Sequence, residues 1–256
     1  ALRSHLENEG IKPGDRVAVY MRNCPEYLIA FYGIWSMGAV ILPINSKLHT
    51  KEVGWILENA GCAYVLCEES SISEINFPGV TVFNPKWQQF DSNIHIPPVK
   101  RSSTDLAWLF YTSGTTGRPK GVMITHGMIM TMALSYFADV DQVHPSDTTL
   151  YAAPMSHGAG LYSVMHVLAG ARHAIPVSGG FDEEEIFGLA ETLQNVHMFA
   201  APTMVKRLTT FSRKNGYDGD GIRTIVYAGG PMYLSDIIEA VEQFGSLFIQ
   251  VYGQGE

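Results

Sequence analysis

Short apolar runs alternate with longer amphipathic segments along the first part of the chain. The runs are typical of buried strands, and the segments between them are typical of helices. The segment 51–61 places four apolar side chains on one helix face and ends at Gly61, a common helix stop. Those four are Val53, Ile56, Leu57 and Ala60. The pattern predicts strands at 15–20, 40–45, 63–68 and 80–83, and helices at 1–10, 25–38 and 51–61.

The alternation stops at 84–104 and then resumes. This stretch contains Pro85, Pro97 and Pro98 and has no hydrophobic period, so we expect subdomains of 1–100 and 101–256. Beyond it the pattern predicts strands at 106–111, 148–154, 196–202, 224–230 and 247–253, and helices at 126–137 and 182–194. Strands that alternate with helices of this length indicate an α/β fold with largely parallel sheets covered on both faces.

Composition narrows the class of protein. The chain has 256 residues, 46% of them hydrophobic, and 17 basic against 25 acidic residues give a net charge of -8. No tract of clustered Lys and Arg occurs, so we expect no nucleic-acid partner. Three cysteines without C-x-x-C spacing favour a reduced, cytoplasmic setting. No apolar run approaches the ~20 residues of a membrane helix, so we expect no transmembrane segment, although an N-terminal Ala leaves a removed leader open.

The stretch YTSGTTGRPKG at 111–121 carries the most distinctive chemistry. It follows a predicted strand and reaches a predicted helix only near Thr125, and loops after parallel strands are common ligand sites. Its glycines let the backbone approach an anion, and its hydroxyls and lysine supply donors and a positive charge. The alternative is a plain surface turn rich in Ser, Thr and Gly.

Two familiar nucleotide motifs do not fit. A P-loop requires Ser or Thr directly after its lysine, whereas Lys120 is preceded by Pro119 and followed by Gly121. The dinucleotide fingerprint also fails at 158–163, because Ser163 occupies the position of the third glycine.

The stretch resembles the signature loop of the adenylate-forming enzymes, a superfamily of acyl-CoA synthetases, firefly luciferases and amino-acid adenylation domains. Four more segments are similar to the family's motifs and follow in the expected order. They are 33–48, the P-x-x-H-x-x-G turn at 154–160, the adenine-side segment 228–232, and 252–256 in place of Y-G-x-T-E. The resemblance implies layered, mixed, largely parallel sheets in an α-β-α-β-α arrangement, as in an acyl-CoA synthetase N-terminal domain.

The resemblance also implies a reaction. A carboxylate attacks the α-phosphate of ATP, pyrophosphate leaves, and coenzyme A takes the acyl group from the acyl-adenylate. Since both reacting groups are anions, the site must neutralise charge and align them. The expected cofactors are therefore ATP, Mg²⁺ and coenzyme A.

Site residues follow from the matched motifs. The nucleotide-binding residues expected from the resemblance are Thr112, Ser113, Gly114, Thr115, Thr116, Gly117, Lys120, Gly229, Gly230, Pro231, Tyr252, Gly253 and Gln254. The expected catalytic residues are Thr112, Lys120, His157 and Glu256. Glu256 and Thr112 would supply the hard oxygen ligands that Mg²⁺ prefers.

The chain departs from the family pattern at its end. Gly255 stands where the family usually has Thr, which removes one phosphate-directed hydroxyl. The family's ribose-binding aspartate, hinge and C-terminal lysine domain have no counterpart after Glu256, and the family usually starts earlier. We therefore expect most of the large N-terminal domain of a longer enzyme, with weak nucleotide binding and little activity alone, and with coenzyme A binding dependent on the absent domain.

The acid is expected to lack an amino group. Amino-acid adenylation domains usually carry an Asp in the turn at 154–160, and this turn has no carboxylate to pair a buried ammonium. Met155, Phe199, Met204 and Met232 could line an apolar tunnel or simply pack the core. We expect a medium- to long-chain fatty acid, with an aryl or other carboxylic acid as the alternative, and a homodimer as a further partner.

The sequence is also consistent with two other classes of protein. One is a nucleotide-binding module without catalysis, and the other is a phosphoryl-transfer enzyme that releases orthophosphate. Dependence on a carboxylate and release of pyrophosphate distinguish adenylation from both.

Overall fold

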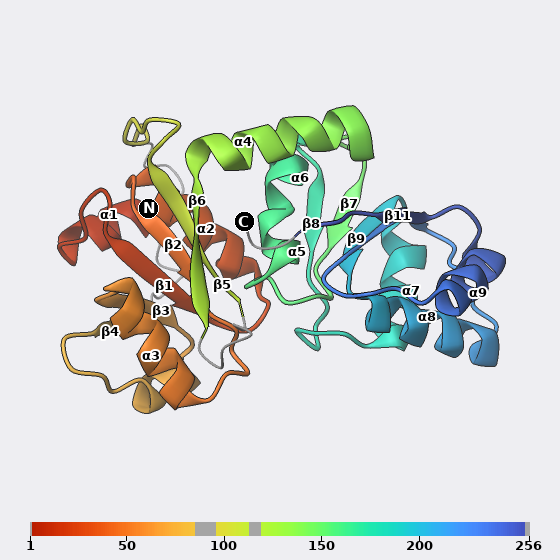
Figure 1. The fold of residues 1–256 in the computed structure, drawn as a ribbon, viewed down its shortest axis with the longest axis horizontal. Helices are drawn as coiled ribbons and strands as arrows, with labels where there is room; N and C mark the ends of the chain where they lie inside the picture. The colour runs from red at the N-terminus through yellow and green to blue at the C-terminus, as the bar shows by residue number, and fades with distance from the viewer. Residues whose placement is uncertain (1, 85–95, 113–118, 254–256) are drawn as a thin grey trace. The chain divides into compact units, whose positions relative to one another are not determined.

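The computed structural model describes residues 2–84, 96–112 and 119–253, which form two compact units. The first unit ends at Met130 and the second begins at Thr131. Each unit contains one sheet flanked by helices (Figure 1), which confirms the predicted α/β class. Within the described ranges, no helix has the length and apolar character needed to cross a membrane.

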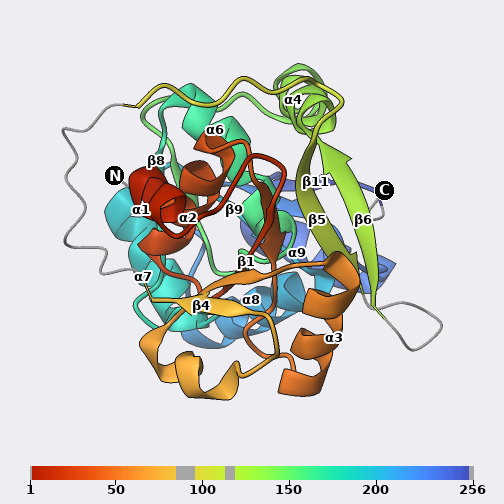
Figure 2. The same cartoon turned by 90° about the vertical axis from the view of Figure 1, so that its left-hand side faces the viewer.

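The first unit is built on a sheet with the order β4-β3-β1-β2-β5-β6. All neighbouring strands are parallel except β5 and β6, which form an antiparallel edge (Figure 2). The strands are β1 (Arg16–Tyr20), β2 (Val40–Pro43), β3 (Tyr64–Cys67), β4 (Thr81–Phe83), β5 (Leu106–Thr112) and β6 (Lys120–Thr125). The helices are α1 (Leu2–Asn8), α2 (Pro25–Ser36), α3 (Thr50–Ala60), the 3-10 helix η1 (Glu69–Glu74) and α4 (His126–Ser135), which continues into the second unit.

Helix α3 forms as its sequence predicts. Its buried residues are the four predicted for the apolar face, Val53, Ile56, Leu57 and Ala60. The His49 ring accepts a hydrogen bond from the Lys51 amide at 3.2 Å and caps the start. Gly61 ends the helix in the left-handed region with φ of 59°, a conformation that favours glycine. Full burial of a side chain such as Ile56 stabilises the fold by about 1.5–3 kcal/mol.

Helix α2 ties β5 into the first unit. Phe31 is fully buried, and its ring packs edge-on against Trp108 of β5 with 4.8 Å between centroids. The Trp35 indole donates a hydrogen bond to the Ala107 carbonyl at 2.9 Å. Because β5 is bound to the first sheet in this way, the predicted subdomain boundary at 84–104 lies inside the first unit, and the division falls after Met130.

The segment between β5 and α4 differs from the prediction of one long loop. Lys120–Thr125 is strand β6, which pairs antiparallel with β5. Its side chains alternate, since Ile124 is buried and Met123 is 68% exposed. Gly121 lies opposite Tyr111, and a Cβ at this glycine would come within 2.8 Å of the Tyr111 ring. The glycine is therefore needed for packing at this position.

The second unit is built on a fully parallel sheet with the order β11-β10-β9-β7-β8. The strands are β7 (Thr148–Leu150), β8 (Arg172–Ala174), β9 (Val196–Ala200), β10 (Ile222–Tyr227) and β11 (Phe248–Gln250). The helices are the π-helical turn η3 (Tyr136–Val140), α5 (Gly158–Leu161), α6 (Ser163–Ala169), α7 (Glu183–Leu193), α8 (Pro202–Asn215) and α9 (Leu234–Phe244). All four strands predicted in this region are present, with β8 as an addition.

The core of the second unit packs α7, α8 and α9 against the sheet. Asp182 caps α7 by accepting a hydrogen bond from the Glu185 amide at 2.9 Å, as the acidic start of this helix predicts. The Phe187 ring of α7 stacks on Tyr217 with 4.8 Å between centroids. Gly221 passes so close to α7 that a Cβ there would lie 2.0 Å from the Ala190 carbonyl oxygen.

Candidate functional site

The strand order of the second unit creates a switch point between β7 and β9. The chain leaves β7 for β8 on one side and then crosses to β9 on the other side. In open parallel sheets, ligands bind beyond the carboxyl ends of the strands at such a point. A pocket lies here, lined by residues of β7, β9 and β10 and by α5, α6 and η3.

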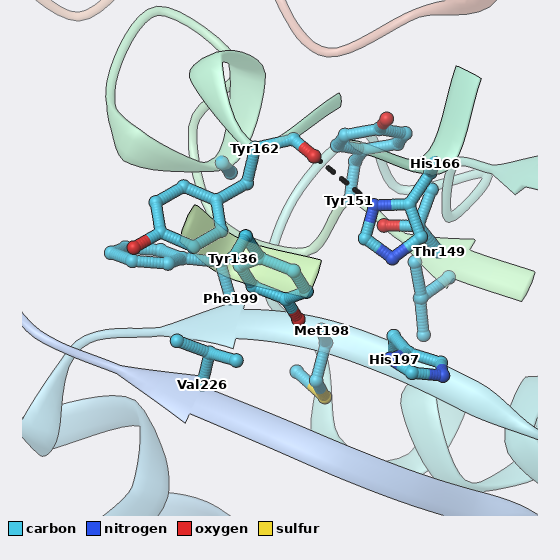
Figure 3. Close-up of a pocket in the computed structure, with 11 residues that line it drawn as sticks. Tyr136, Thr149, Tyr151, Tyr162, His166, His197, Met198, Phe199 and Val226 are labelled. Carbon is cyan, nitrogen blue, oxygen red and sulfur yellow. Dashed lines mark hydrogen bonds between the residues drawn. The ribbon is translucent and has the colours of Figure 1, made fainter. Parts of the chain in front are cut away.

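Aromatic rings form one side of the pocket (Figure 3). The rings of Tyr136 and Tyr162 meet edge to face at 5.6 Å, and Tyr162 and Phe199 lie 5.2 Å apart. Burial raises the pKa of both tyrosine hydroxyls, so they stay neutral. Thr149, His166 and His197 line the opposite side, and Met198 and Val226 lie at its base (Figure 3). The pocket therefore combines a flat apolar wall with a polar one.

His166 is a deeply buried polar group of this pocket. Its ring is 4% exposed, and Nδ1 lies 3.0 Å from the Tyr162 carbonyl oxygen. The ring also meets the His197 ring edge to face at 5.4 Å. Burial, with a smaller contribution from the neighbouring His197 and His173 rings, lowers the pKa of His166 to about 4, so the ring is neutral at pH 7.

A cluster of charged side chains contacts the His197 ring and holds its orientation. Asp147 is 2% exposed and accepts hydrogen bonds from the Arg223 guanidinium at 2.5 Å and from the His144 amide at 2.7 Å. Its Oδ2 lies 3.1 Å from His197 Nε2, and Asp141 Oδ2 lies 3.3 Å from His197 Nδ1. Burial lowers the pKa of His197, and the two carboxylates partly offset this. The cluster fixes the His197 ring at the polar wall.

The predicted turn at 154–160 lies beside the pocket. It follows β7, and Ala159 lines the pocket. A Cβ on Gly158 would come within 2.9 Å of the Phe199 ring, so glycine allows this close approach. His157 is exposed at the start of α5, and its Nδ1 lies 2.9 Å from the Ser156 hydroxyl. Partial burial lowers the pKa of the His157 ring, which favours its neutral form.

The other motif segments of this unit follow β10 and β11 at the same sheet edge. Gly229 has φ of 85°, and Gly229, Gly230 and Pro231 are exposed in the turn after β10. Tyr252 follows β11 with its ring 94% exposed, and Gly253 is also exposed. Tyr252 is therefore not a core residue. Because β7, β10 and β11 are parallel, the segments after them lie on one edge of the sheet.

The glycine-rich stretch belongs to the first unit. Thr112 ends β5, half-buried, and Lys120 begins β6 with an exposed side chain. Ser113, Gly114, Thr115, Thr116 and Gly117 lie outside the described residues, as do Gln254, Gly255 and Glu256. The magnesium site predicted at Glu256 and Thr112 thus stays a prediction. The described part of the chain contains no cluster of three His, Cys, Asp or Glu side chains suited to a metal ion.

The predicted apolar tunnel is represented in this pocket by one residue. Phe199 lines it, whereas Met204 and Met232 pack against the core of the second unit. The Met204 sulfur also accepts a hydrogen bond from the Ala201 amide at 3.4 Å. Met155 is fully buried and is not among the lining residues. Core packing, the alternative considered for these methionines, accounts for Met204 and Met232.

Sequence reasoning did not identify the polar wall. His166 and His197 stand inside the apolar runs SVMHVLA and VHMFA, at positions that the surrounding pattern would assign to the core. A histidine inside a buried run is a signal, because burial of its ring requires hydrogen-bond partners. Tyr136 and Tyr162 gave no such signal, since tyrosine is common at buried positions.

Comparison with known proteins gives a consistent family. The sequence matches the family described as AMP-binding enzyme over residues 1–256. A feruloyl-CoA synthase of Amycolatopsis is 28% identical over 100% of this chain and 52% of its own length. The long-chain-fatty-acid–CoA ligase FadD13 of Mycobacterium tuberculosis is 30% identical over 92% of this chain and 50% of its own length.

The fold agrees with this assignment. An inhibitor-bound crystal structure of the N-terminal domain of FACL13 from Mycobacterium tuberculosis superposes with a TM-score of 0.84 at 28% identity, covering 99% of this chain and 66% of that one. The chain spans about half the length of the curated relatives it matches. Because the family match covers its whole length, the chain belongs to the AMP-binding enzyme family.

Proposed function

We propose that this chain forms the nucleotide- and acid-binding part of an AMP-forming acid–CoA ligase. The reaction joins a carboxylate to the α-phosphate of ATP, with pyrophosphate as the leaving group, and the acyl-adenylate then passes its acyl group to coenzyme A. The observation that carries the proposal is the gathering of the His157 turn, the Gly229 turn and Tyr252 at the carboxyl edge of the second unit's sheet, beside a pocket.

Each of these groups has a chemical task in the proposal. The exposed Tyr252 ring offers a flat face to adenine, and the left-handed Gly229 turn exposes backbone groups to the base. The neutral His157 ring can hydrogen-bond the reacting carboxylate without an ionic charge of its own. These roles are alignment and charge placement, which suits a reaction between two anions.

The hairpin of the first unit supplies the phosphate-binding groups in the proposal. Thr112 and Lys120 flank the glycine-rich stretch and bring one hydroxyl and one positive charge to its base. The glycines in the sequence between them allow backbone N–H groups to approach the β- and γ-phosphates closely. Mg²⁺ would accompany the nucleotide, held by phosphate oxygens together with Thr112 and Glu256.

The lining of the pocket indicates which class of carboxylic acid the protein binds in this proposal. The sequence predicted a medium- to long-chain fatty acid, and FadD13 is named for such a substrate. The aromatic wall of Tyr136, Tyr162 and Phe199 and the polar wall of His166 favour the alternative, an aryl acid. The relative named feruloyl-CoA synthase matches this chain from end to end, and its name supports the same alternative, an aryl acid.

Thermal unfolding with non-hydrolysable acyl-adenylate analogues tests the proposal. The analogues carry octanoyl, hexadecanoyl, benzoyl or cinnamoyl groups, and magnesium-ATP, pyrophosphate and orthophosphate serve as references. A ligand at one hundred times its dissociation constant adds about 2.7 kcal/mol of stability. At about 2–4 °C per kcal/mol for a protein of this size, the midpoint should rise by roughly 5–11 °C.

The variant Tyr252→Ala provides the matched test of the nucleotide end. Because its ring is 94% exposed, its removal should leave the unliganded midpoint unchanged and reduce the shift given by every adenylate. Ile238→Ala, at an exposed apolar position of α9, is the control. If no adenylate raises the wild-type midpoint, or if only triphosphates do, the adenylation proposal is wrong and a nucleotide-binding or phosphoryl-transfer role takes its place.

A further inference from the structure

The polar wall of the pocket carries one hydrogen-bonding atom without a partner. His166 Nε2 is buried and has no hydrogen-bond partner among the described residues. The ring itself is held in place by α6 and by the contact of Nδ1 with the Tyr162 carbonyl oxygen at 3.0 Å (Figure 3). A buried polar atom left unpaired costs about 1–3 kcal/mol, so this atom requires an explanation.

The Tyr162 carbonyl fixes which proton the ring carries. A carbonyl oxygen can only accept a hydrogen bond, so Nδ1 must be the protonated nitrogen. The ring is neutral, because burial lowers its pKa to about 4, and a neutral imidazole has only one N–H. Nε2 therefore presents a lone pair, and the group that pairs with it must be a donor.

The surrounding side chains do not supply that donor. His197 is engaged with Asp147 and Arg223 at 3.1 and 3.0 Å. His173, another neighbour of His166, is paired through its Nδ1 with the Tyr151 hydroxyl at 2.7 Å. The free acceptor thus faces a pocket whose other wall consists of aromatic rings.

The pocket is joined to the proposed reaction centre through one contact. Gly158 follows His157 directly and lies against the Phe199 ring, where a Cβ would come within 2.9 Å. An acid held with its carboxylate at His157 would therefore extend past Phe199 toward His166. The space between the side chains is narrow, so an entering ring has to displace the half-buried Tyr162 or Phe199 side chain.

We propose that the pocket receives the ring of an aromatic acid that carries a phenolic hydroxyl, and that this hydroxyl donates a hydrogen bond to His166 Nε2. The inference rests on the proposed function and names its substrate class. A flat ring matches the wall of Tyr136, Tyr162 and Phe199. A saturated fatty chain would leave Nε2 unpaired, which is the penalty by which sites built for a hydroxyl reject analogues without one.

The experiment compares ligands that differ by one atom. The dissociation constants of 4-hydroxycinnamoyl, cinnamoyl and octanoyl sulfamoyl-adenosine are measured by calorimetry with the chain and with His166→Phe. The wild-type chain should bind the hydroxylated ring about tenfold more tightly than the plain ring, the value of one well-placed hydrogen bond of ~1.4 kcal/mol. His166→Phe should remove this preference and still bind the cinnamoyl compound.

The control variant is His173→Phe, which replaces a neighbouring histidine whose Nδ1 is already paired. It should keep the preference for the hydroxyl, whatever its effect on stability. If all three wild-type constants agree, or if octanoyl binds most tightly, then Nε2 pairs with water or is left unpaired and the substrate class is wrong, while adenylation stands. If no adenylate binds, the proposed function itself fails.

Discussion

Thr112 and Lys120 face each other across the antiparallel pair of β5 and β6, at the base of the glycine-rich stretch. The pairing fixes the two ends of the stretch, because a strand ladder sets the register of both chains. The hydroxyl and the ammonium are thereby carried by backbone that the sheet holds in place. A loop that ran freely from β5 to α4 would impose no such geometry.

Loss of the Lys120 charge should weaken nucleotide binding. We expect Lys120→Ala to raise the dissociation constant of magnesium-ATP by about 10- to 100-fold, since a charged hydrogen bond to phosphate contributes ~1.5–3 kcal/mol. The side chain is exposed, so the folded state should be unaffected. Calorimetric titration at two salt concentrations measures the loss and its electrostatic origin.

Lys100→Ala is the matched control, because Lys100 is also exposed but lies outside the hairpin. Equal affinities for wild type, Lys100→Ala and Lys120→Ala would show that Lys120 does not contact phosphate.

Replacement of two glycines near α7 by alanine should change the free energy of unfolding in opposite directions. Gly221 has φ of 79°, and a Cβ there would lie 2.0 Å from the Ala190 carbonyl oxygen, so Gly221→Ala should destabilise the chain by several kcal/mol. Gly188 is exposed within α7 and a Cβ there meets no atom within 4 Å. Gly188→Ala should therefore stabilise the chain by about 0.5–1 kcal/mol.

Urea unfolding measures both changes. The sign is the informative result, since the two substitutions add the same methyl group. A Gly188→Ala variant less stable than wild type would mean that this face of α7 is covered rather than exposed.

The hydrophobic pattern predicted most elements because they bury one face each. Helix α3 shows why: Ile56 and Leu57 recur on one face, and Gly61 provides the left-handed stop, so local and tertiary preferences agree. Strand β6 was missed because its three apolar residues, Val122, Met123 and Ile124, follow a stretch dominated by Gly, Thr and Lys. Its pairing with β5 is a tertiary contact that the local pattern encodes weakly.

Some residues of the candidate site were likewise predicted from the sequence, and others were not. Tyr252 and Gly229 were predicted from motifs; the Tyr252 ring is exposed and Gly229 is in the left-handed region, and their binding roles stay predictions. His166 and His197 were not predicted, because their roles depend on which strands and helices meet. The Tyr162 carbonyl that fixes the His166 proton is one such contact, and no spacing in the sequence specifies it.

The buried carboxylate of Asp147 should be essential for stability. Asp147→Asn removes the charge that the Arg223 guanidinium pairs with, and it introduces an amide donor among groups that already donate. Breaking a buried ion pair typically costs about 3–5 kcal/mol. The thermal midpoint should fall by at least about 6 °C.

Asp139→Asn gives the comparison, because Asp139 is exposed and carries the same charge. We expect its midpoint to stay within about 2 °C of wild type. A similar small change for Asp147→Asn would mean that the cluster contributes little and that Arg223 is stabilised by the Gln142 carbonyl instead.

Stability should decrease with acid because His166 is buried in its neutral form. Its pKa is about 4 in the folded chain and 6.5 in the unfolded chain, so the unfolded state binds the proton first. The contribution is complete above pH 6.5 and is lost as the pH falls from 6.5 to 4. By linkage the loss reaches about 3 kcal/mol at pH 4.

His166→Phe isolates this contribution, because phenylalanine fills the site without binding a proton. The free energy of unfolding of wild type should fall more steeply between pH 6.5 and 4.5 than that of the variant. His144→Gln, at an exposed position, should retain the wild-type slope. A slope remains in every variant, because burial also lowers the pKa of His157, His173 and His197. Parallel curves for wild type and His166→Phe would mean that His166 takes up its proton as readily in the folded chain as in the unfolded one, and the neutral acceptor proposed for Nε2 would then be wrong as well.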